Sequence, residues 1–427
     1  MSRWRPSLAT LSLAALVLGL GGGLLAQLTH SAPLIAIAAA LAPIGTIWTN
    51  AIRMTVIPIV LTSLVLAVTA ASDARTVGRL GALSVATFVV LLAIGGALTA
   101  LLVPPLLGAL PHGALSLGTP AATPAATAAG DESFVDWLVR LVPTNPFQSA
   151  AAGDLLPLLV FTVLFALALM RLPSDRREAV VSPVRAASDA LFTMLRWILT
   201  ITPVAVFCLT FQLGARTGVT GLGTVGAFVV LVSVLLVGFT MLLYPLAVIG
   251  GGVPLGRFAR AMRAAQILAA STRSSLAALP ALQQGIEREL DLPPTVTRFV
   301  VPLSVVAFRM NRTLSSTAKL LFLAAVYGVP LAPYQVLAFV ATAILVSFTT
   351  PGVPSAGSVA TLPVYLAFGI PIEGVVILNA VEAIPDIFKT VLNVTADGAA
   401  TAVVAKLAGA TVQAPVAVGA TTVLEES

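Results

Sequence analysis

The chain is a series of long apolar runs separated by short polar segments. Six such runs cover roughly residues 8–28, 33–71, 79–108, 153–171, 184–214 and 222–250. A helix needs about 20 apolar residues to span a bilayer, so each run can cross, and the longest must tilt, kink or extend beyond the membrane. The first run resembles a signal peptide, but its length and the lack of a clear cleavage site favour a first spanning helix. The pattern predicts an all-α polytopic membrane protein, whereas a β-barrel would show short alternating strands.

Beyond residue 255 the apolar segments become shorter and are broken by Pro, Gly and Ser. Two small, polar, helix-breaking stretches lie between apolar arms: ILAASTRSSLAALP, ending at Pro280, and SFTTPGVPSAGS, residues 347–358. Irregular backbone at membrane depth persists only where it is buried in protein or lines a cavity. Paired broken segments therefore favour a transport site, and two ordinary surface loops are the alternative interpretation.

The last apolar segment carries a polar stripe. Its members are Glu382, Asp386, Lys389, Thr390, Asn393 and Asp397. On a helix these positions share one face. A charge at mid-bilayer costs at least ~2.5–3.5 kcal/mol, so we expect the stripe to face protein or water. Its carboxylate, ammonium, hydroxyl and amide groups suit a zwitterionic or anionic solute.

A second polar cluster, RMNRT at residues 309–313, interrupts another apolar segment. Arg309 and Arg312 need anionic partners there, and Asp386 and Asp397 are candidates. The cluster then has two interpretations: structural salt bridges, or part of a solute or cation pathway.

Composition supports the membrane assignment: 58% of the residues are hydrophobic and 9% are charged, against about 25% charged in a soluble domain. The net charge of +6 reflects arginines in alternate loops, which indicates cytoplasmic termini and basic loops rather than nucleic-acid binding. The single cysteine forms no intramolecular disulfide, and the two histidines lack metal-site spacing.

Enzymatic functions are poorly supported. There is no HExxH metalloprotease motif and no GxxxxGK[ST] phosphate loop for an ATP-driven pump. Ser274 or Ser275 with Lys389 could form a protease dyad only if the fold brought them together. We therefore predict a non-enzyme without an organic cofactor.

Several motifs resemble the dicarboxylate/amino acid:cation symporter family, which includes the glutamate transporters. STRSSLAALP and TPGVPSAG resemble the tips of its two re-entrant hairpins, PDIFKTVLNVTAD its last helix, and RMNRT occupies the place of its unwound Asn-Met-Asp-Gly-Thr motif. The resemblance implies eight spanning helices, two re-entrant hairpins and a homotrimer. It places most of the scaffold in 1–255, with some transport-domain helices interleaved, the transport-domain core in 256–410 and a tail in 411–427.

The resemblance also implies roles for individual residues. Asp386 would bind a substrate ammonium, Lys389 a side-chain carboxylate, and Asn393 the main-chain carboxylate. The remaining substrate-binding positions would be Ser274, Ser275, Thr313, Gly352, Val353, Pro354 and Thr390. Asn393 and Asp397 would be Na⁺ ligands.

The unwound motif departs from the family pattern. Arg309, Asn311 and Arg312 replace the family's Asn, Asp and Gly. A guanidinium cannot ligate Na⁺ and would repel one nearby. One hypothesis is that Arg309 or Arg312 acts as a built-in cation beside Asp397, making the protein proton-coupled or cation-independent. Glu382 and Asp386 are the candidate proton carriers.

The sequence thus predicts a secondary symporter of acidic amino acids or C4-dicarboxylates, working by an elevator mechanism in the cytoplasmic membrane. The alternative is a degenerate paralogue that binds its solute as a receptor without transporting it.

Overall fold

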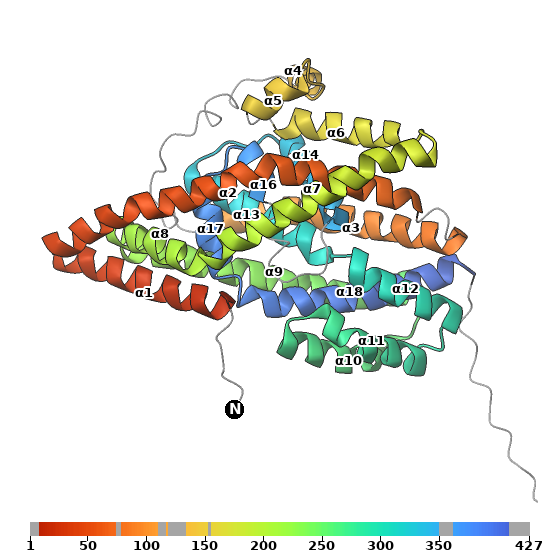
Figure 1. Cartoon of the computed structure of the whole chain (residues 1–427). Helices are drawn as coiled ribbons and strands as arrows, with labels where there is room; N and C mark the ends of the chain where they lie inside the picture. Colours follow the sequence, from red (N-terminus) through yellow and green to blue (C-terminus); the bar gives the residue numbers. More distant parts are fainter. Residues whose placement is uncertain are drawn as a thin grey trace, which may run out of the picture.

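The computed structural model describes residues 8–73, 78–109, 117, 134–152, 155–349 and 362–409, and the regular elements within these ranges are all helices (Figure 1). The helices of the first 252 residues are α1 (Leu8–Thr29), α2 (Ala32–Asp73), α3 (Gly78–Gly108), α4 (Phe134–Arg140), α5 (Pro146–Ala152), α6 (Leu155–Leu169), α7 (Ser174–Thr200), α8 (Thr202–Thr217) and α9 (Val219–Gly251). They are followed by α10 (Leu255–Thr272), α11 (Ser275–Glu289), α12 (Pro294–Ala307), α13 (Met310–Tyr327), α14 (Pro333–Thr349), α16 (Leu362–Ala367), α17 (Ile372–Ala380) and α18 (Pro385–Leu407).

Four helical spans in the described ranges are long and apolar enough to cross a bilayer: Thr10–Thr29, Arg79–Gly108, Val219–Gly251 and Pro385–Leu407. The pair α7 and α8, bent by 54°, forms a fifth if it is one broken span. Shorter apolar helices, including parts of α2, α6 and α14, add to these. The prediction of an all-α polytopic membrane protein is confirmed.

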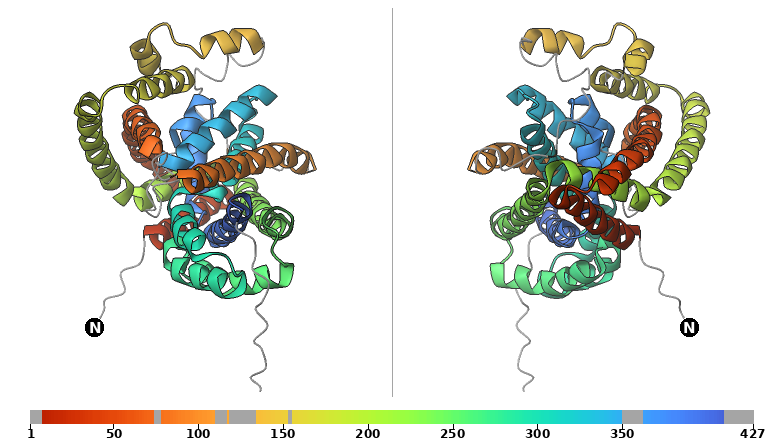
Figure 2. Two further views of the ribbon diagram at one scale, coloured as in Figure 1. Left: turned by 90° about the vertical axis from the view of Figure 1, so that its right-hand side faces the viewer. Right: turned by 90° about the vertical axis from the view of Figure 1, so that its left-hand side faces the viewer.

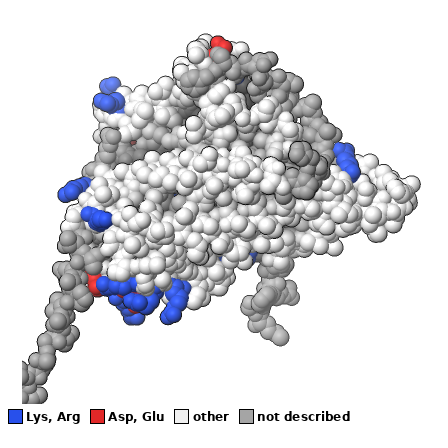
Figure 3. All heavy atoms as spheres, turned by 180° about the vertical axis from the view of Figure 1, so that it is seen from behind, with Lys and Arg blue, Asp and Glu red and all other residues white. Residues whose placement is uncertain are grey.

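The outer surface of the protein suits lipid. Leu101, Val230 and Ile249 are each more than 60% exposed, which water would penalise and hydrocarbon would not. Figure 3 shows one face that is almost wholly uncharged, with Lys and Arg at its margins.

Helix α18 differs from the other spanning helices because protein covers most of it. Its apolar window is 78% buried, against 33–39% in the other three spans. It runs alongside α9 and contacts α3, α10, α11, α12 and α13 (Figures 1 and 2). The expectation that the polar stripe faces protein rather than lipid is confirmed.

The first predicted helix break is a tight hairpin of α10 and α11. Arg273 ends α10 in the left-handed conformation (φ 53°), and Ser274 caps α11 by accepting a hydrogen bond from Ala277 N at 3.3 Å. The arms approach so closely that a Cβ added to Gly285 would lie 2.1 Å from Ala261 O. At the far end of the arms, Arg257 pairs with Asp291.

The second predicted break lies between α14 and α16. The apolar arms are helical, as expected, but residues 350–361 lie outside the described ranges. They include Gly352, Val353 and Pro354, whose predicted contact with solute stays a prediction.

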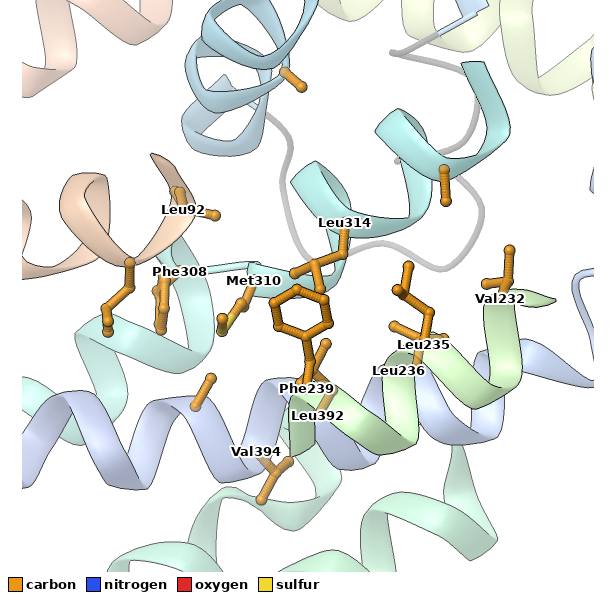
Figure 4. Close-up of a cluster of buried hydrophobic side chains, with 14 of the residues drawn as sticks. Leu92, Val232, Leu235, Leu236, Phe239, Phe308, Met310, Leu314, Leu392 and Val394 are labelled. Atoms are coloured by element: carbon orange, nitrogen blue, oxygen red, sulfur yellow. The ribbon is translucent and has the colours of Figure 1, made fainter. Parts of the chain in front are cut away.

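The RMNRT cluster coincides with a break between α12 and α13. Phe308 and Arg309 leave the helical conformation with ψ values of 103° and 77°, and α13 begins at Met310. The break is held in an apolar cluster contributed by α3, α9, α13 and α18 (Figure 4). Phe308 stacks on Phe88 with ring centroids 4.8 Å apart. Packing thus fixes the position of an irregular backbone segment.

The helices fall into two neighbourhoods. Helix α1 packs along α8, and α2 packs against α6, α7 and α8, whereas α3 and α9 join the helices that follow residue 255. The assignment of scaffold and transport domains to 1–255 and 256–410 stays a prediction.

The hairpin contact gives a stability prediction. Replacing Gly285 with Ala forces the Ala261 carbonyl away, so we expect a loss of about 1–3 kcal/mol, typical of overpacking, seen as a lower thermal unfolding midpoint in detergent. Gly223→Ala is the matched control, because nothing lies within 4 Å of a Cβ built there. Equal midpoints for the two variants would contradict the close approach of α10 and α11.

Candidate functional site

The polar stripe forms the buried face of α18. Lys389, Thr390, Asn393 and Asp397 are each 6% exposed or less, and Asp386 lies in the first turn of the helix. Glu382 was predicted to share this helical face, but it lies in the turn between α17 and α18, because α18 begins at Pro385. Proline suits a first helical turn, where its missing N–H removes no helical hydrogen bond.

The main ionic contact of the site is a carboxylate shared by two lysines. Glu382 Oε1 accepts a hydrogen bond from Lys319, and Glu382 Oε2 lies 3.0 Å from Lys389 Nζ. Lys319 also donates to Asn379 Oδ1. Two helices and the turn before α18 are therefore joined around one buried acid, and these three charges sum to +1.

The unwound segment is attached to the stripe by an amide. Asn393 Oδ1 accepts a hydrogen bond from the backbone N–H of Asn311 at 3.0 Å. This satisfies a donor in the first turn of α13, which has no intrahelical partner. The fully buried Thr313 lies two residues further along α13, and its hydroxyl donates to Met310 O at 3.3 Å. The predicted site residues of α13 and α18 are thus brought together.

Asp397 and Arg309 interact through space but form no salt bridge. Arg309 acts electrostatically on Asp397, which is fully buried. Within the described part of the chain, neither Asp397 oxygen nor Arg309 Nη2 has a hydrogen-bond partner. Ser304, the nearby hydroxyl, donates to Val301 O at 2.9 Å. The salt bridge predicted between this arginine and Asp397 is therefore not formed as a direct contact.

Arg312 has a different environment from Arg309. Its electrostatic neighbours are Arg309, Tyr365 and Glu382, so it belongs to the lysine–glutamate end of the site. The two arginines of RMNRT, equivalent in the sequence, interact with each other but with different acids: Arg312 with Glu382, and Arg309 with Asp397.

Both arms of the first hairpin pack against α18, and Arg273 lies at the hairpin's tip. Arg273 acts electrostatically on Asp386. Ser275 is 5% exposed, and the Ser274 hydroxyl caps α11. Lys389 pairs with Glu382 and Ser274 with Ala277 N, so these contacts do not support the serine–lysine dyad considered above.

Lys319 is the site residue that sequence reasoning missed. It is a lone lysine in the apolar run LSSTAKLLFLAAVY, and such intramembrane charges usually mark function. The signal was present, but its partners come from residues about sixty positions away, which no local pattern shows. Gln266 was also missed: it donates to Thr395 at 2.8 Å and so attaches α10 to α18.

The arrangement can hold a small anion. Lys389 offers an ammonium for a carboxylate, Asp386 an acceptor for an ammonium, and Thr390 and Asn393 offer uncharged polar groups on the same face. Among the described residues, no group of three His, Cys, Asp or Glu side chains could hold a metal ion. Binding of charged solute groups by these side chains stays a prediction.

Comparison with known proteins gives consistent matches. The profile of the sodium:dicarboxylate symporter family matches residues 8–407. The "Proton/glutamate-aspartate symporter" of Escherichia coli K12 is 31% identical over 376 residues, which cover 86% of this chain and 85% of the relative. The "Proton/sodium-glutamate symport protein" of Bacillus subtilis is 29% identical over 415 residues, covering 96% and 94% of the two chains. The "C4-dicarboxylate transport protein" of Cupriavidus necator is 28% identical over 380 residues, covering 86% and 85%.

These matches confirm the family resemblance inferred from the motifs. The matched proteins are transporters. This confirms the predictions that the protein is a multi-pass membrane protein and that it is not an enzyme.

Proposed function

Because the chain belongs to the sodium:dicarboxylate symporter family, we propose that it is a secondary symporter of acidic amino acids or C4-dicarboxylates. The observation that carries this proposal is the buried face of α18, where a lysine ammonium and an aspartate carboxylate lie one helical turn apart. A bilayer tolerates such charges only where they are paired or line a pathway. The named substrates of the relatives, glutamate, aspartate and C4-dicarboxylates, have the matching charges.

In this proposal Lys389 binds a solute carboxylate and Asp386 the ammonium of an amino-acid substrate. Thr390, Asn393, Thr313 and the first hairpin tip at Ser274 and Ser275 complete the pocket. The tip of the second hairpin, at Gly352–Pro354, closes over the solute. Movement of the transport domain as one body, the elevator mechanism, carries the closed pocket across the membrane.

The coupling ion is a separate proposal. We infer that Na⁺ does not occupy the position beside Asp397, because the residues there do not fit it. Arg309 acts electrostatically on the fully buried Asp397 carboxylate, and its guanidinium repels a second cation brought to the same place. Arg309 then provides a fixed positive charge where the family name implies sodium, and H⁺ is the driving ion. Of the two candidate carriers, Glu382 and Asp386, the second fits this role better because Glu382 is held by two lysines.

We further propose a homotrimer in the cytoplasmic membrane, with both termini on the cytoplasmic side. The exposed apolar faces are compatible with lipid and with partner subunits. The mass of the purified protein in a defined detergent, measured by light scattering, should equal three chains, and a monomer mass would contradict the trimer. Labelling of single cysteines placed at Arg171 and at Ser427 in intact cells should fail, and labelling from outside would contradict the orientation.

The role of Lys389 is tested by binding. Hydrogen bonds to charged groups contribute about 1.5–3 kcal/mol, so Lys389→Ala should weaken aspartate and succinate binding by about 10- to 100-fold. Isothermal titration of purified protein would measure this. Lys406→Ala is the charge-matched control, since that lysine binds the Ile249 carbonyl at the other end of α18. Anionic ligands that bind Lys389→Ala as tightly as wild type would contradict the assignment.

Counterflow separates a transporter from a receptor. Proteoliposomes loaded with unlabelled substrate should accumulate external labelled substrate transiently. Binding without counterflow would favour the receptor alternative.

Coupling is tested by exchanging cations. Uptake into proteoliposomes should proceed equally with Na⁺ or choline outside, and an inward proton gradient should stimulate it. Arg309→Gln removes the fixed positive charge that acts on the buried Asp397 carboxylate, and it should abolish uptake. Arg298→Gln, at a highly exposed position of α12, is the control. Strict Na⁺ dependence of the wild-type protein would overturn the proposal.

A further inference from the structure

Lys319 is a deeply buried cation without a role in the proposed function. Its side chain is 4% exposed, in the middle of α13. Burying an ammonium is costly unless charged and hydrogen-bonding partners compensate for the lost water. Its partners come from several elements: Glu382 and Asn379 accept its hydrogen bonds, and the rings of Phe228 and Tyr365 each lie 5.9 Å from Nζ. Rings at this distance attract an ammonium.

Glu382 is held at both oxygens. Oε1 faces Lys319 and Oε2 faces Lys389, and the exposed side-chain fractions are 4% for Lys319, 14% for Glu382 and 7% for Lys389. Lys319 is the most enclosed of the three. Both ammonium groups are buried, but Lys389 lies on the face of α18 that also carries Asp386 and Asn393, whereas Lys319 lies on α13.

This geometry bears on how a solute reaches Lys389. Glu382 contacts the Lys389 ammonium, which is the group that the proposed function assigns to a solute carboxylate. A solute must displace Glu382, and leaving a buried carboxylate without a cation is strongly unfavourable. Lys319 removes this obstacle, because Glu382 stays paired when Lys389 turns to the solute. The charge sum of +1 also leaves one positive charge for the incoming anion.

We propose that Lys319 is a positioning residue that retains Glu382 and so frees Lys389 to bind the anionic group of the solute. Glu382 acts as an internal anion that neutralises Lys389 between transport cycles. Asn379 fixes the direction of the Lys319 ammonium. The proposal rests on the proposed function, since it requires Lys389 to bind solute.

A purely structural role makes a different prediction. If the Lys319–Glu382 pair only stabilised the fold, removing it would lower the stability of the protein. The solute affinity of a Lys319 variant would then be the same whether residue 382 is charged or neutral. If Lys319 competes with Lys389 for Glu382, loss of Lys319 strengthens the Glu382–Lys389 pair and weakens solute binding. Loss of the Glu382 charge then restores binding.

The experiment compares Lys319→Met, Glu382→Gln and the double variant by isothermal titration with succinate and with aspartate. Lys319→Met should weaken binding of both ligands at least about tenfold, equivalent to 1.4 kcal/mol. The double variant, with neutral side chains at both positions, should bind at least as tightly as wild type. Lys319→Arg should retain most of the affinity, and Lys406→Met, a lysine removed far from the site, should retain all of it.

Two outcomes overturn the inference: wild-type affinity in Lys319→Met, or a double variant that binds as weakly as Lys319→Met. Should Lys319→Met not fold, the double variant decides alone, and weakened binding there overturns the inference. Lys389→Ala separates the two proposals. Unchanged affinity in Lys389→Ala removes the proposed site itself, whereas lost affinity there with unchanged affinity in Lys319→Met removes only the role of Lys319.

Discussion

Neutralising charge without water is the constraint on which the rest of this structure depends. Lys319 lies on α13, Lys389 on α18 and Glu382 in the turn before α18. Each charge would cost much free energy if it were buried alone in a low-dielectric interior. Their mutual contacts fix the position of α13 relative to α18 and the direction of the turn that enters α18. The surrounding helices complete this arrangement by covering α18, which is why that helix is mostly buried while the other spanning helices present apolar side chains outward.

The same constraint applies to the backbone. Where α12 gives way to α13, the first N–H groups of α13 have no helical acceptor, and Asn393 provides one. Phe308 and Met310 on either side of the break pack into the apolar cluster, so the chain is anchored by apolar contacts while its polar groups bond across to α18. The break therefore places the first turn of α13 against the polar stripe of α18, and the backbone groups at the break are not exposed to lipid.

Sequence reasoning predicted what depends on local pattern. The apolar runs, the break at Arg273–Ser274 and the buried stripe from Asp386 to Asp397 follow from periodicity and helix-breaking residues, whereas the break before Met310 was expected only from the family resemblance. It placed Glu382 on α18 because the spacing of 382 and 386 fits a helix, but Pro385 starts the helix later. It treated Arg309 and Arg312 as equivalent and omitted Lys319, because ion pairing in a folded chain depends on which distant helices meet.

The two unusual cation positions share a physical consequence. A mobile ion can leave a buried carboxylate, whereas a tethered guanidinium or ammonium stays, so Arg309 beside Asp397 and Lys319 beside Glu382 make local charge independent of ion concentration. The two differ in geometry. Lys319 is fully engaged with Glu382 and Asn379, whereas Arg309 and Asp397 interact only through space and keep unsatisfied atoms. Unsatisfied buried groups cost free energy that a closer pairing would recover. The Arg309–Asp397 pair is therefore the part of the site with the most to gain from rearrangement, and the Lys319–Glu382 pair the part with the least.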